Sequence, residues 1–459
     1  MAKAFRGDTL AFVAREFGRT DLGDERLRRR LVQIVVDLTE DPGRSIPQAS
    51  GRWASTKGAY RFFSNPRVTR EGVMKGHWEQ TSERIQCRDA VLVVEDTTFL
   101  NFSHHPKTKG LGKIGNQRAA NQLQGVLVHS ALAVDVVNHQ VLGLIGQEVI
   151  VRKEYQSSGE SPEAKRVRPR ESGKWMTSAR GVIQRVGKAD SLIFTFDREG
   201  DVFEVVEELQ QRGARYVIRA AWNRRIEGAE ALPAYLLDQV HREPILGEMD
   251  VEVAGKEGRT ARRTKLKLRS GTYRVKPPKR SERSEPVEVR MVCATEENPP
   301  AGVDPLEWML LTTEPIQTAE DVQKVVRHYT GRWKIEEWHK VLKTGCRIEE
   351  RELETWERLD SLLGILSILA WRLLSMRDAA RMGEASVKDY LSDSEQAVLR
   401  AMDPSLKKES PLRDYLRSIA KLGGFLARKR DGNPGWITLW RGSTRLHDLD
   451  QGFRLARSQ

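Results

Sequence analysis

Apolar residues recur at helical spacing through the first part of the chain. Four of them share one helix face: Leu31, Ile34, Val35 and Leu38. Asp24 precedes this helix and can cap its start, and Pro42-Gly43 ends it. A second helix is predicted from Trp53 to Phe63, and another after Asn65-Pro66. We therefore expect residues 1–75 to form a helical domain.

The pattern changes to short apolar runs near residue 90. Ala90–Glu95 and Ser191–Phe196 are β-prone, and each run is followed directly by an aspartate. The other predicted elements are strands at Gln124–Val134, Gln140–Val151 and Tyr216–Ala220, a hairpin turn at 135–139, and a helix at Val202–Gln211. Residues from about 225 to 315 are β-prone again and are predicted to be an insertion. This order of elements is typical of a mixed α/β domain.

Helical periodicity returns after the insertion. Thr318 opens a helix with Asp321 as its capping-box partner, and the helix is expected to run towards Thr344-Gly345. Gly331 lowers its stability by about 1 kcal/mol relative to alanine and allows a break there. Trp356–Arg377 is a further helix, and the tail from residue 385 is helical and basic. The predicted division is a helical domain at 1–75, an α/β domain at 76–378 and a helical domain at 379–459.

Charge and cysteine content narrow the class of protein. Lys and Arg number 77 against 64 Asp and Glu, a net charge of +13 that favours a polyanionic partner, nucleic acid first. The alternative is a merely basic soluble protein. Three separated cysteines without a CxxC pair argue against disulfides and structural zinc. The first residues lack an apolar signal region, and Leu362–Leu374 is too short to cross a membrane, so we expect a cytoplasmic protein with no membrane partner.

Two aspartates follow apolar strands and are candidates for metal binding. Asp96 ends the predicted first strand and Asp197 ends a later one, so both are expected where the sheet meets solvent. Glu95 should face the opposite side of the sheet by strand alternation, and Asp201 fits the start of the next helix. The alternative for either aspartate is a turn or helix cap.

A single carboxylate among cations is predicted on the helix that contains Glu336. On an ideal helix, a phenol, three cations and Glu336 fall within an arc of about 80°. These residues are Tyr329, Arg332, Glu336, Lys340 and Lys343, while Ile335, Trp338 and Leu342 lie on the opposite side. The alternative is an exposed face with an i,i+4 ion pair between Glu336 and Lys340.

Carboxylates that meet in a basic groove suit cleavage of a phosphodiester. Two divalent ions about 3.5–4 Å apart activate the attacking oxygen and stabilise the leaving oxygen. Mg²⁺ prefers oxygen ligands and lets substrate phosphates complete its coordination. Asp96, Asp197 and Glu336 are therefore the candidate ligands of two Mg²⁺ ions, for which Mn²⁺ is expected to substitute.

The motifs around these residues resemble a known family. Tyr329-x-x-Arg332-x-x-x-Glu336-x-x-x-x-x-x-Lys343 is similar to the YREK signature of bacterial Asp–Asp–Glu transposases of the insertion-sequence-four group. Glu95-Asp96-Thr97-Thr98 and Asp197-Arg198-Glu199 resemble the motifs at that group's two aspartates. Four further motifs resemble the transposase type of composite transposon five: Leu22-Gly-Asp24, Gly58-Ala-Tyr-Arg-Phe62, Glu171-Ser-Gly-Lys-Trp175 and Leu422-Gly-Gly-Phe425. Together they extend over nearly the whole chain.

The resemblance implies a cut-and-paste DNA transposase. It implies an RNase H-like core with a β-rich insertion, an N-terminal DNA-binding domain and a C-terminal dimerisation domain. Its substrates would be double-stranded transposon ends and target DNA, cut through a hairpin intermediate within a homodimer. Asp96, Asp197 and Glu336 would be the catalytic metal ligands. Six further positions would contact DNA: Arg30, Arg61, Trp308, Tyr329, Arg332 and Lys343. Lys340 is a further candidate for DNA contact, because helical spacing places it on the same face as Arg332 and Lys343.

Some features depart from the family or leave alternatives open. Trp308 would pack against a flipped base, but it also fits a core position in a strand from Glu307 to Leu311. Ser55-Thr56 stands where the family has an internal start methionine, which argues against a truncated inhibitor. The basic loop 153–170 is longer than the family pattern. The alternative functions are a catalytically inactive DNA-binding regulator and a structure-selective nuclease.

Overall fold

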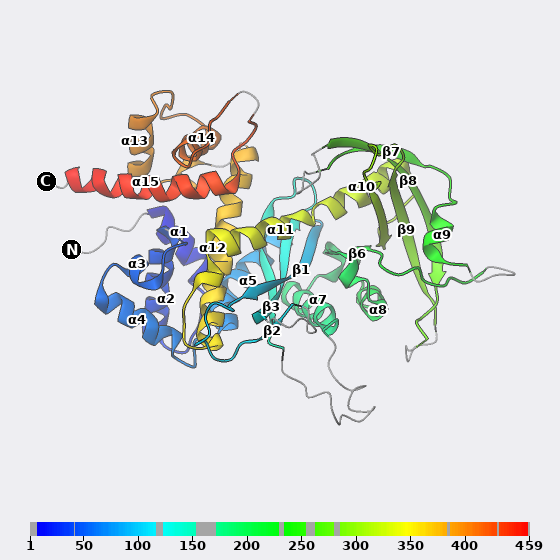
Figure 1. The fold of residues 1–459 in the computed structure, drawn as a ribbon, viewed down its shortest axis with the longest axis horizontal. Helices are drawn as coiled ribbons and strands as arrows, with labels where there is room; N and C mark the ends of the chain where they lie inside the picture. Colours follow the sequence, from blue (N-terminus) through cyan, green and yellow to red (C-terminus); the bar gives the residue numbers. More distant parts are fainter. Residues whose placement is uncertain are drawn as a thin grey trace.

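A central twisted sheet organises the molecule, with helices packed beside it and both helical ends of the chain on the same side (Figure 1). The structure is a computed structural model that describes residues 7–40, 42–115, 123–152, 171–228, 234–253, 262–279, 285–382, 386–428 and 431–457. Within these ranges the ten-stranded sheet has the order β2-β3-β1-β5-β6-β10-β9-β8-β7, and β4 pairs with β3. The β1–β5 and β5–β6 pairs are parallel, whereas the others are antiparallel.

The strands of the first half follow the predicted pattern closely. They are β1 (Val91–Asn101), β2 (Gly112–Ile114), β3 (Leu123–Asp135), β4 (Val141–Ile150), β5 (Leu192–Phe196) and β6 (Arg215–Arg219). The helices among and after them are α7 (Gly173–Val186), α8 (Phe203–Gln211) and α9 (Leu236–Val240). The hairpin turn between β3 and β4 contains His139 at a φ of 56°, as a tight turn often requires.

The N-terminal region is helical, as predicted. Its helices are α1 (Gly7–Phe17), α2 (Glu25–Glu40), α3 (Ile46–Ser50), α4 (Trp53–Phe63) and α5 (Arg70–Gln86). The Asp24 carboxylate accepts a hydrogen bond from the Arg26 N–H at 2.8 Å, which confirms the predicted cap of α2. The apolar stripe of α2 is buried: Leu31, Ile34, Val35 and Leu38 are at most 5% exposed.

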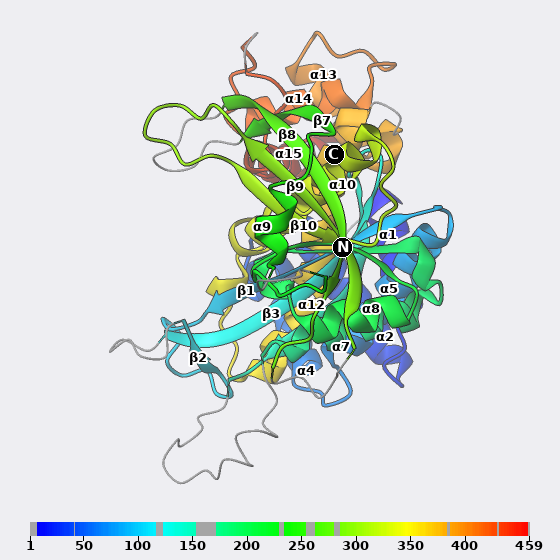
Figure 2. The same cartoon turned by 90° about the vertical axis from the view of Figure 1, so that its right-hand side faces the viewer.

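The predicted insertion is β-rich but prolongs the central sheet. Its strands are β7 (Gly247–Val253), β8 (Arg262–Val275), β9 (Val287–Glu296) and β10 (Glu307–Thr312). β10 pairs with β6 on one side and β9 on the other, so hydrogen bonding continues from the core into the insertion. Figure 2 shows β8 and β9 as a long ribbon on this side of the molecule. The basic loop 153–170 lies outside the described residues.

The helix predicted from Thr318 is interrupted. Thr318 and Asp321 form the expected capping box of α10 (Ala319–Thr330), and Gly331 separates α10 from α11 (Trp333–Lys340). A Cβ on residue 331 would lie 2.6 Å from Leu92 Cδ1, so any larger residue here would require the Leu92 side chain to shift. α11 continues into a π-helical turn at Val341–Gly345.

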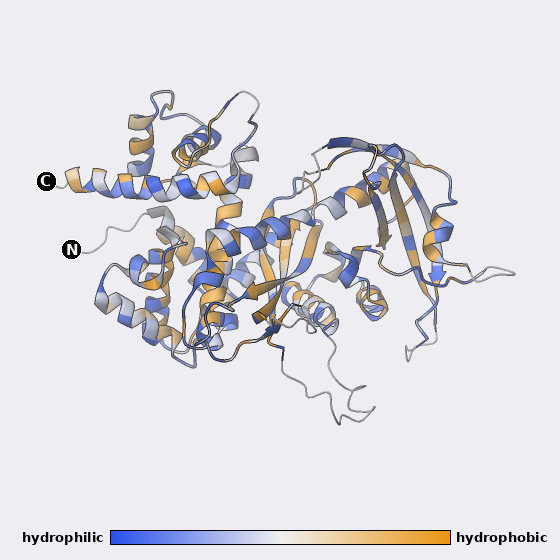
Figure 3. Cartoon of the chain, in the orientation of Figure 1, coloured by the Kyte–Doolittle hydropathy of each residue, from blue (hydrophilic) through white to orange (hydrophobic). Residues whose placement is uncertain are grey.

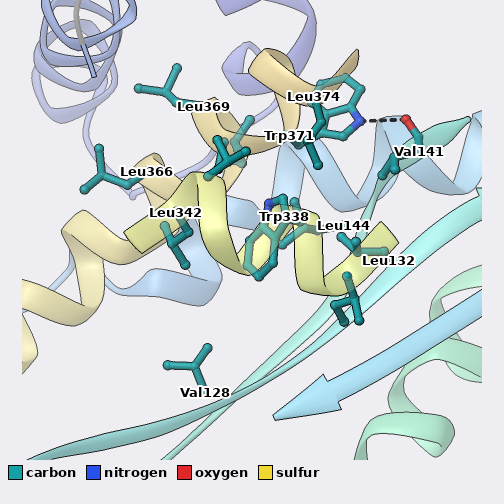
Figure 4. Close-up of a cluster of buried hydrophobic side chains, with 14 of the residues drawn as sticks. Val128, Leu132, Val141, Leu144, Trp338, Leu342, Leu366, Leu369, Trp371 and Leu374 are labelled. Atoms are coloured by element: carbon teal, nitrogen blue, oxygen red, sulfur yellow. Dashed lines mark hydrogen bonds between the residues drawn. The ribbon is translucent and has the colours of Figure 1, made fainter. Parts of the chain in front are cut away.

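Helices α11 and α12 (Trp356–Met382) cover one face of the sheet. Figure 4 shows Trp338, Leu366, Leu369 and Trp371 packed above apolar residues of β3 and β4. The Trp371 indole N–H donates to the Val141 carbonyl at 2.9 Å, which satisfies the polar atom of a buried ring. α7 and α8 cover the other face through a second apolar cluster. Hydrophobic residues are concentrated on these strands and on α12 (Figure 3).

The C-terminal region is helical, as predicted. It contains α13 (Asp393–Met402), α14 (Leu412–Leu422) and α15 (Trp436–Arg457), which share a separate apolar cluster. Among the described helices, the segment Trp356–Asp378 is long and apolar enough to cross a membrane, but 72% of its most apolar stretch is buried inside the protein. The apolar segment is therefore longer than the predicted Leu362–Leu374, and most of it is buried in the core.

Candidate active site

Asp96 and Asp197 lie at equivalent positions along two neighbouring parallel strands, Asp96 within β1 and Asp197 directly after β5. The pairing of β1 with β5 aligns Val94 with Thr195, and each aspartate is two residues further along. Because side chains alternate along a strand, both carboxylates point to the face covered by α11. Asp96 was predicted to end its strand; this was wrong, because β1 continues to Asn101. β1 extends beyond the end of β5 because it also pairs with β3. In that pairing Asp96 lies opposite Ser130.

Backbone N–H groups orient both carboxylates. The Thr97 N–H donates to Asp96 Oδ1 at 2.8 Å, and the Glu199 N–H donates to Asp197 Oδ1 at 2.9 Å. In the second case Asp197 caps the short 3₁₀ turn Arg198–Gly200. The alternative role considered for these aspartates, that of a helix cap, is thus filled by Oδ1 of Asp197.

The pKa of Asp96 responds to both other carboxylates of the predicted triad. Burial, followed by the negative charge of Asp197, raises the pKa of Asp96 from 3.8 to about 6, and Glu336 acts in the same direction. The Thr97 hydrogen bond and the Arg332 guanidinium oppose this rise without cancelling it. At Asp96, burial and the two neighbouring carboxylates therefore outweigh the Arg332 guanidinium.

Arg332 contacts both Asp96 on the sheet and Glu336 on α11. Its Nη1 lies 3.7 Å from Asp96 Oδ2, and its Nη2 donates to Glu336 Oε1 at 2.6 Å. The Arg332 side chain is 8% exposed, whereas that of Glu336 is 38% exposed. The break at Gly331 places Arg332 at the start of α11, between the two carboxylates.

Oxygen ligands of this type fit a hard divalent cation, and the excess negative charge at Asp96 favours one. Among the described residues, however, no three histidine, cysteine or acidic side chains stand ready-made as a metal-binding group. Glu336 is directed to Arg332 instead. The hydrogen bond to Arg332 uses one of the two carboxylate oxygens of Glu336.

The two aromatic residues of the predicted DNA-contact set are buried, as is Arg332. The Tyr329 and Trp308 rings pack edge to face with centroids 5.6 Å apart and are 3% and 8% exposed. The predicted surface location of the Tyr329 phenol on one helix face was wrong, because Gly331 breaks that helix and α10 packs its end onto β10. Trp308 occupies the core position that was considered as its alternative.

The remaining cations of the predicted set lie on the surface. Lys340 is exposed at the end of α11. Lys343 lies in the π-helical turn, 3.7 Å from Glu349 Oε1, an oxygen that also accepts the Asn101 N–H at 2.7 Å. Turns of this kind are frequent at functional sites. Arg30 in α2 and Arg61 in α4 lie in the N-terminal helical region, apart from the carboxylates.

A buried polar network beneath Asp96 was not predicted. Glu95 is fully buried, accepts a hydrogen bond from Ser178 at 2.9 Å and contacts His129 at 3.1 Å, and His129 reaches the Thr97 hydroxyl at 3.0 Å. Strand alternation predicted only that Glu95 faces away from Asp96. Its partners come from β3 and α7, and no local spacing in the sequence connects them.

Asp201 was predicted to start the next helix, and this was wrong. α8 begins at Phe203 after Val202, which makes no side-chain cap. The fully buried Asp201 carboxylate instead accepts the N–H groups of Ala221 and Trp222 and pairs with Arg224. Burial of the acid is stabilised by this cation and these donors.

Comparison with known protein families assigns each region. Residues 10–68 match the family described as Transposase DNA-binding, residues 177–373 match the Transposase DDE domain, and residues 368–459 match the Transposase Tn5 dimerisation domain. The DDE match includes Asp197 and Glu336 and begins after Asp96. The mixed α/β fold with helical flanking regions and an RNase H-like DDE domain is confirmed. The chain therefore carries, in this order, the DNA-binding, catalytic and dimerisation domains of a Tn5-type DDE transposase.

Proposed function

We propose that this DNA transposase belongs to the insertion-sequence-four group and moves DNA by a cut-and-paste route. The observation that carries this proposal is the meeting of Asp96 with Asp197 and Glu336 at one sheet edge, with Arg332 between Asp96 and Glu336. A buried acid with a raised pKa that lacks enough neighbouring cations is typical of a functional site. The YREK spacing supports the same group.

Asp96, Asp197 and Glu336 are the proposed ligands of two Mg²⁺ ions, which Mn²⁺ can replace. When bound, these ions supply activation of the attacking oxygen and stabilisation of the leaving one. The protein's own contribution is to hold Asp96 and Asp197 on rigid strands. Arg332 is proposed to exchange its hydrogen bond with Glu336 for a DNA phosphate, so that substrate binding frees the third carboxylate.

The proposed DNA path runs from the N-terminal helices to this site. Arg30 and Arg61 would contact the transposon end, while Lys340 and Lys343 would hold phosphates near the carboxylates. Tyr329 and Trp308 would reach a DNA base only after movement of their buried pair. The proposed domains are residues 1–75, 76–378 and 379–459. Cleavage through a hairpin intermediate would take place in the bacterial cytoplasm, within a homodimer that holds two ends.

Cleavage and joining by the purified protein test this function. We expect Mg²⁺-dependent cutting of DNA that carries the repeats flanking the gene, followed by joining of the cut ends to a target. Asp96→Ala should reduce cutting by at least about a thousandfold, since removal of a catalytic group has effects of this size. Asp250→Asn, at an exposed position of β7, is the control and should cut normally.

The outcome also separates the alternatives. End binding without cutting under any metal condition would indicate a DNA-binding regulator. Cutting without joining would indicate a nuclease on the same fold. Full activity of Asp96→Ala would contradict the proposed site.

A further inference from the structure

An exposed tryptophan stands at the same edge of the sheet as the catalytic carboxylates. Trp222 follows β6 and is 65% exposed. β6 is parallel to β5, with Ile218 opposite Phe196, so Arg219 is next to Asp197 in register. Trp222 is three residues beyond Arg219, so its backbone lies at most about 16 Å from that of Asp197. This limit corresponds to roughly five stacked nucleotides of one strand.

The turn that presents Trp222 is firmly held. The fully buried Asp201 accepts the Ala221 N–H at 2.6 Å and the Trp222 N–H at 3.1 Å, and it lies 2.6 Å from Arg224 Nη1. The next residue, Asn223, accepts the Leu237 N–H at 2.8 Å. A large indole thus projects into solvent from a backbone fixed on both sides. Such preorganisation reduces the entropy lost on binding.

The charge around Trp222 suits a nucleic-acid strand. Arg219 and Arg225 lie on either side in sequence, and Arg225 is exposed. Arg219 Nη2 donates to the Glu307 carbonyl at 3.0 Å, which fixes that guanidinium at the same edge of the sheet. An aromatic ring flanked by cations is the usual arrangement for binding unpaired DNA: the ring stacks on a base and the cations contact phosphates.

We propose that Trp222 stacks on an unpaired base of the DNA strand that leads into the active site. This inference rests on the proposed function, because it takes DNA as the molecule held beside Asp197. It differs from the assignment of base packing to Trp308, whose ring is already covered by Tyr329. Every base has an aromatic face, so the contact should tolerate any sequence.

A double-mutant cycle between the protein and the DNA tests the contact. The probe is a duplex with a single-stranded extension, compared with the same DNA carrying one abasic nucleotide at successive positions, in EDTA so that no cutting occurs. At one position, loss of the base should weaken binding by wild-type protein about 5- to 150-fold. Trp222→Ala should bind both DNAs equally, at the weaker level.

Two substitutions at the same position separate stacking from apolar contact. Trp222→Phe should retain most of the sensitivity to the abasic nucleotide, whereas Trp222→Leu should lose it because it has no aromatic face. The salt dependence of binding should stay unchanged in all three variants, since an indole neutralises no phosphate. A changed salt dependence would mean that the turn itself had been disturbed, and would count against the proposal.

Several results would overturn the inference. These are an abasic series without effect on wild-type protein, equal sensitivity of Trp222→Leu and wild type, and a change of oligomeric state in Trp222→Ala without change in DNA coupling. The last would assign the indole to contact with a second copy of the chain. If wild-type protein cuts and joins DNA in Mg²⁺ but shows no coupling, only the inference fails. Absence of both cutting and DNA binding would remove the proposed function itself.

Discussion

Two buried acidic clusters in this molecule differ in the direction in which the pKa of the acid is shifted. Glu16, between α1 and α5, is fully buried, as is its partner His77 at 2.6 Å. Burial alone would raise the pKa of Glu16, but His77, Arg84 and Arg15 together lower it to about 2. At the sheet edge, burial and the charge of Asp197 raise the pKa of Asp96 to about 6 although Arg332 is close.

The difference lies in whether the protein itself balances the charge. His77 Nε2 accepts the Leu144 N–H at 3.0 Å, and burial lowers the His77 pKa, so this ring is neutral and donates its Nδ1 proton to Glu16. Arg84 and Arg15 supply the positive charge. The Glu16 cluster is complete without a ligand. At Asp96, by contrast, burial and the neighbouring carboxylates outweigh Arg332, and the pKa stays raised.

The largest expected effect on stability comes from breaking the complete cluster. Glu16→Gln leaves Arg84 without its buried carboxylate and should destabilise the protein by on the order of 3 kcal/mol near neutral pH, measured by urea unfolding. Because the folded pKa of Glu16 is lowered, its contribution is present above about pH 4.5 and is lost as pH falls towards about 2.

Glu25 provides the control for this prediction. Its pKa is also lowered to about 2, by Arg28 and Arg29, but it lies on the surface of α2. Glu25→Gln should leave the unfolding midpoint unchanged because solvent screens such pairs. An equal loss in both variants would contradict the distinction between a buried cluster and a surface pair.

The second expected effect is a gain in stability rather than a loss. Asp96→Asn removes a buried negative charge that faces Asp197, and should stabilise the metal-free protein by on the order of 1–3 kcal/mol above about pH 6. The folded pKa is raised, so wild type loses this stability as pH rises from about 4 to about 6; the two proteins should be equally stable below about pH 4. Asp250→Asn should show no such gain. A destabilised Asp96→Asn would place this acid with Glu16, as a structural residue.

The sequence predicted the positions of the two aspartates better than their surroundings. An apolar run followed by an acid locates Asp96 and Asp197 along the chain, and the capping box locates the start of α10. Neither pattern states which strand lies beside β1. The parallel pairing that aligns the aspartates joins segments about a hundred residues apart, and it follows from packing of the whole domain.

For a related reason, the sequence did not predict that Tyr329 is buried and that Trp222 is exposed. Helical spacing placed Tyr329 with Arg332 on one face, but Gly331 fits against Leu92 and ends α10 between them. Trp222 follows a strand and would ordinarily be expected inside. Its side chain is exposed, while its backbone N–H is held by the buried Asp201. Both outcomes depend on contacts across elements, which a one-dimensional pattern does not contain.

The smallest expected effect is on metal affinity at the Asp96 cluster, where protons and metal ions compete for the carboxylate. A carboxylate must lose its proton to bind a divalent ion, and the pKa of Asp96 is raised to about 6 by burial and by Asp197. Mn²⁺ affinity, measured by titration calorimetry, should therefore fall about tenfold for each pH unit below about 6 and level off above about 7. Asp96→Asn should bind Mn²⁺ weakly with a flatter pH profile, whereas Glu16→Gln, if folded, should retain the wild-type profile because its cluster is already balanced. Equal Mn²⁺ affinity of wild-type protein at about pH 5 and about pH 7 would show that Asp96 is not a ligand, and that the excess charge at this sheet edge is compensated by Arg332 rather than by metal.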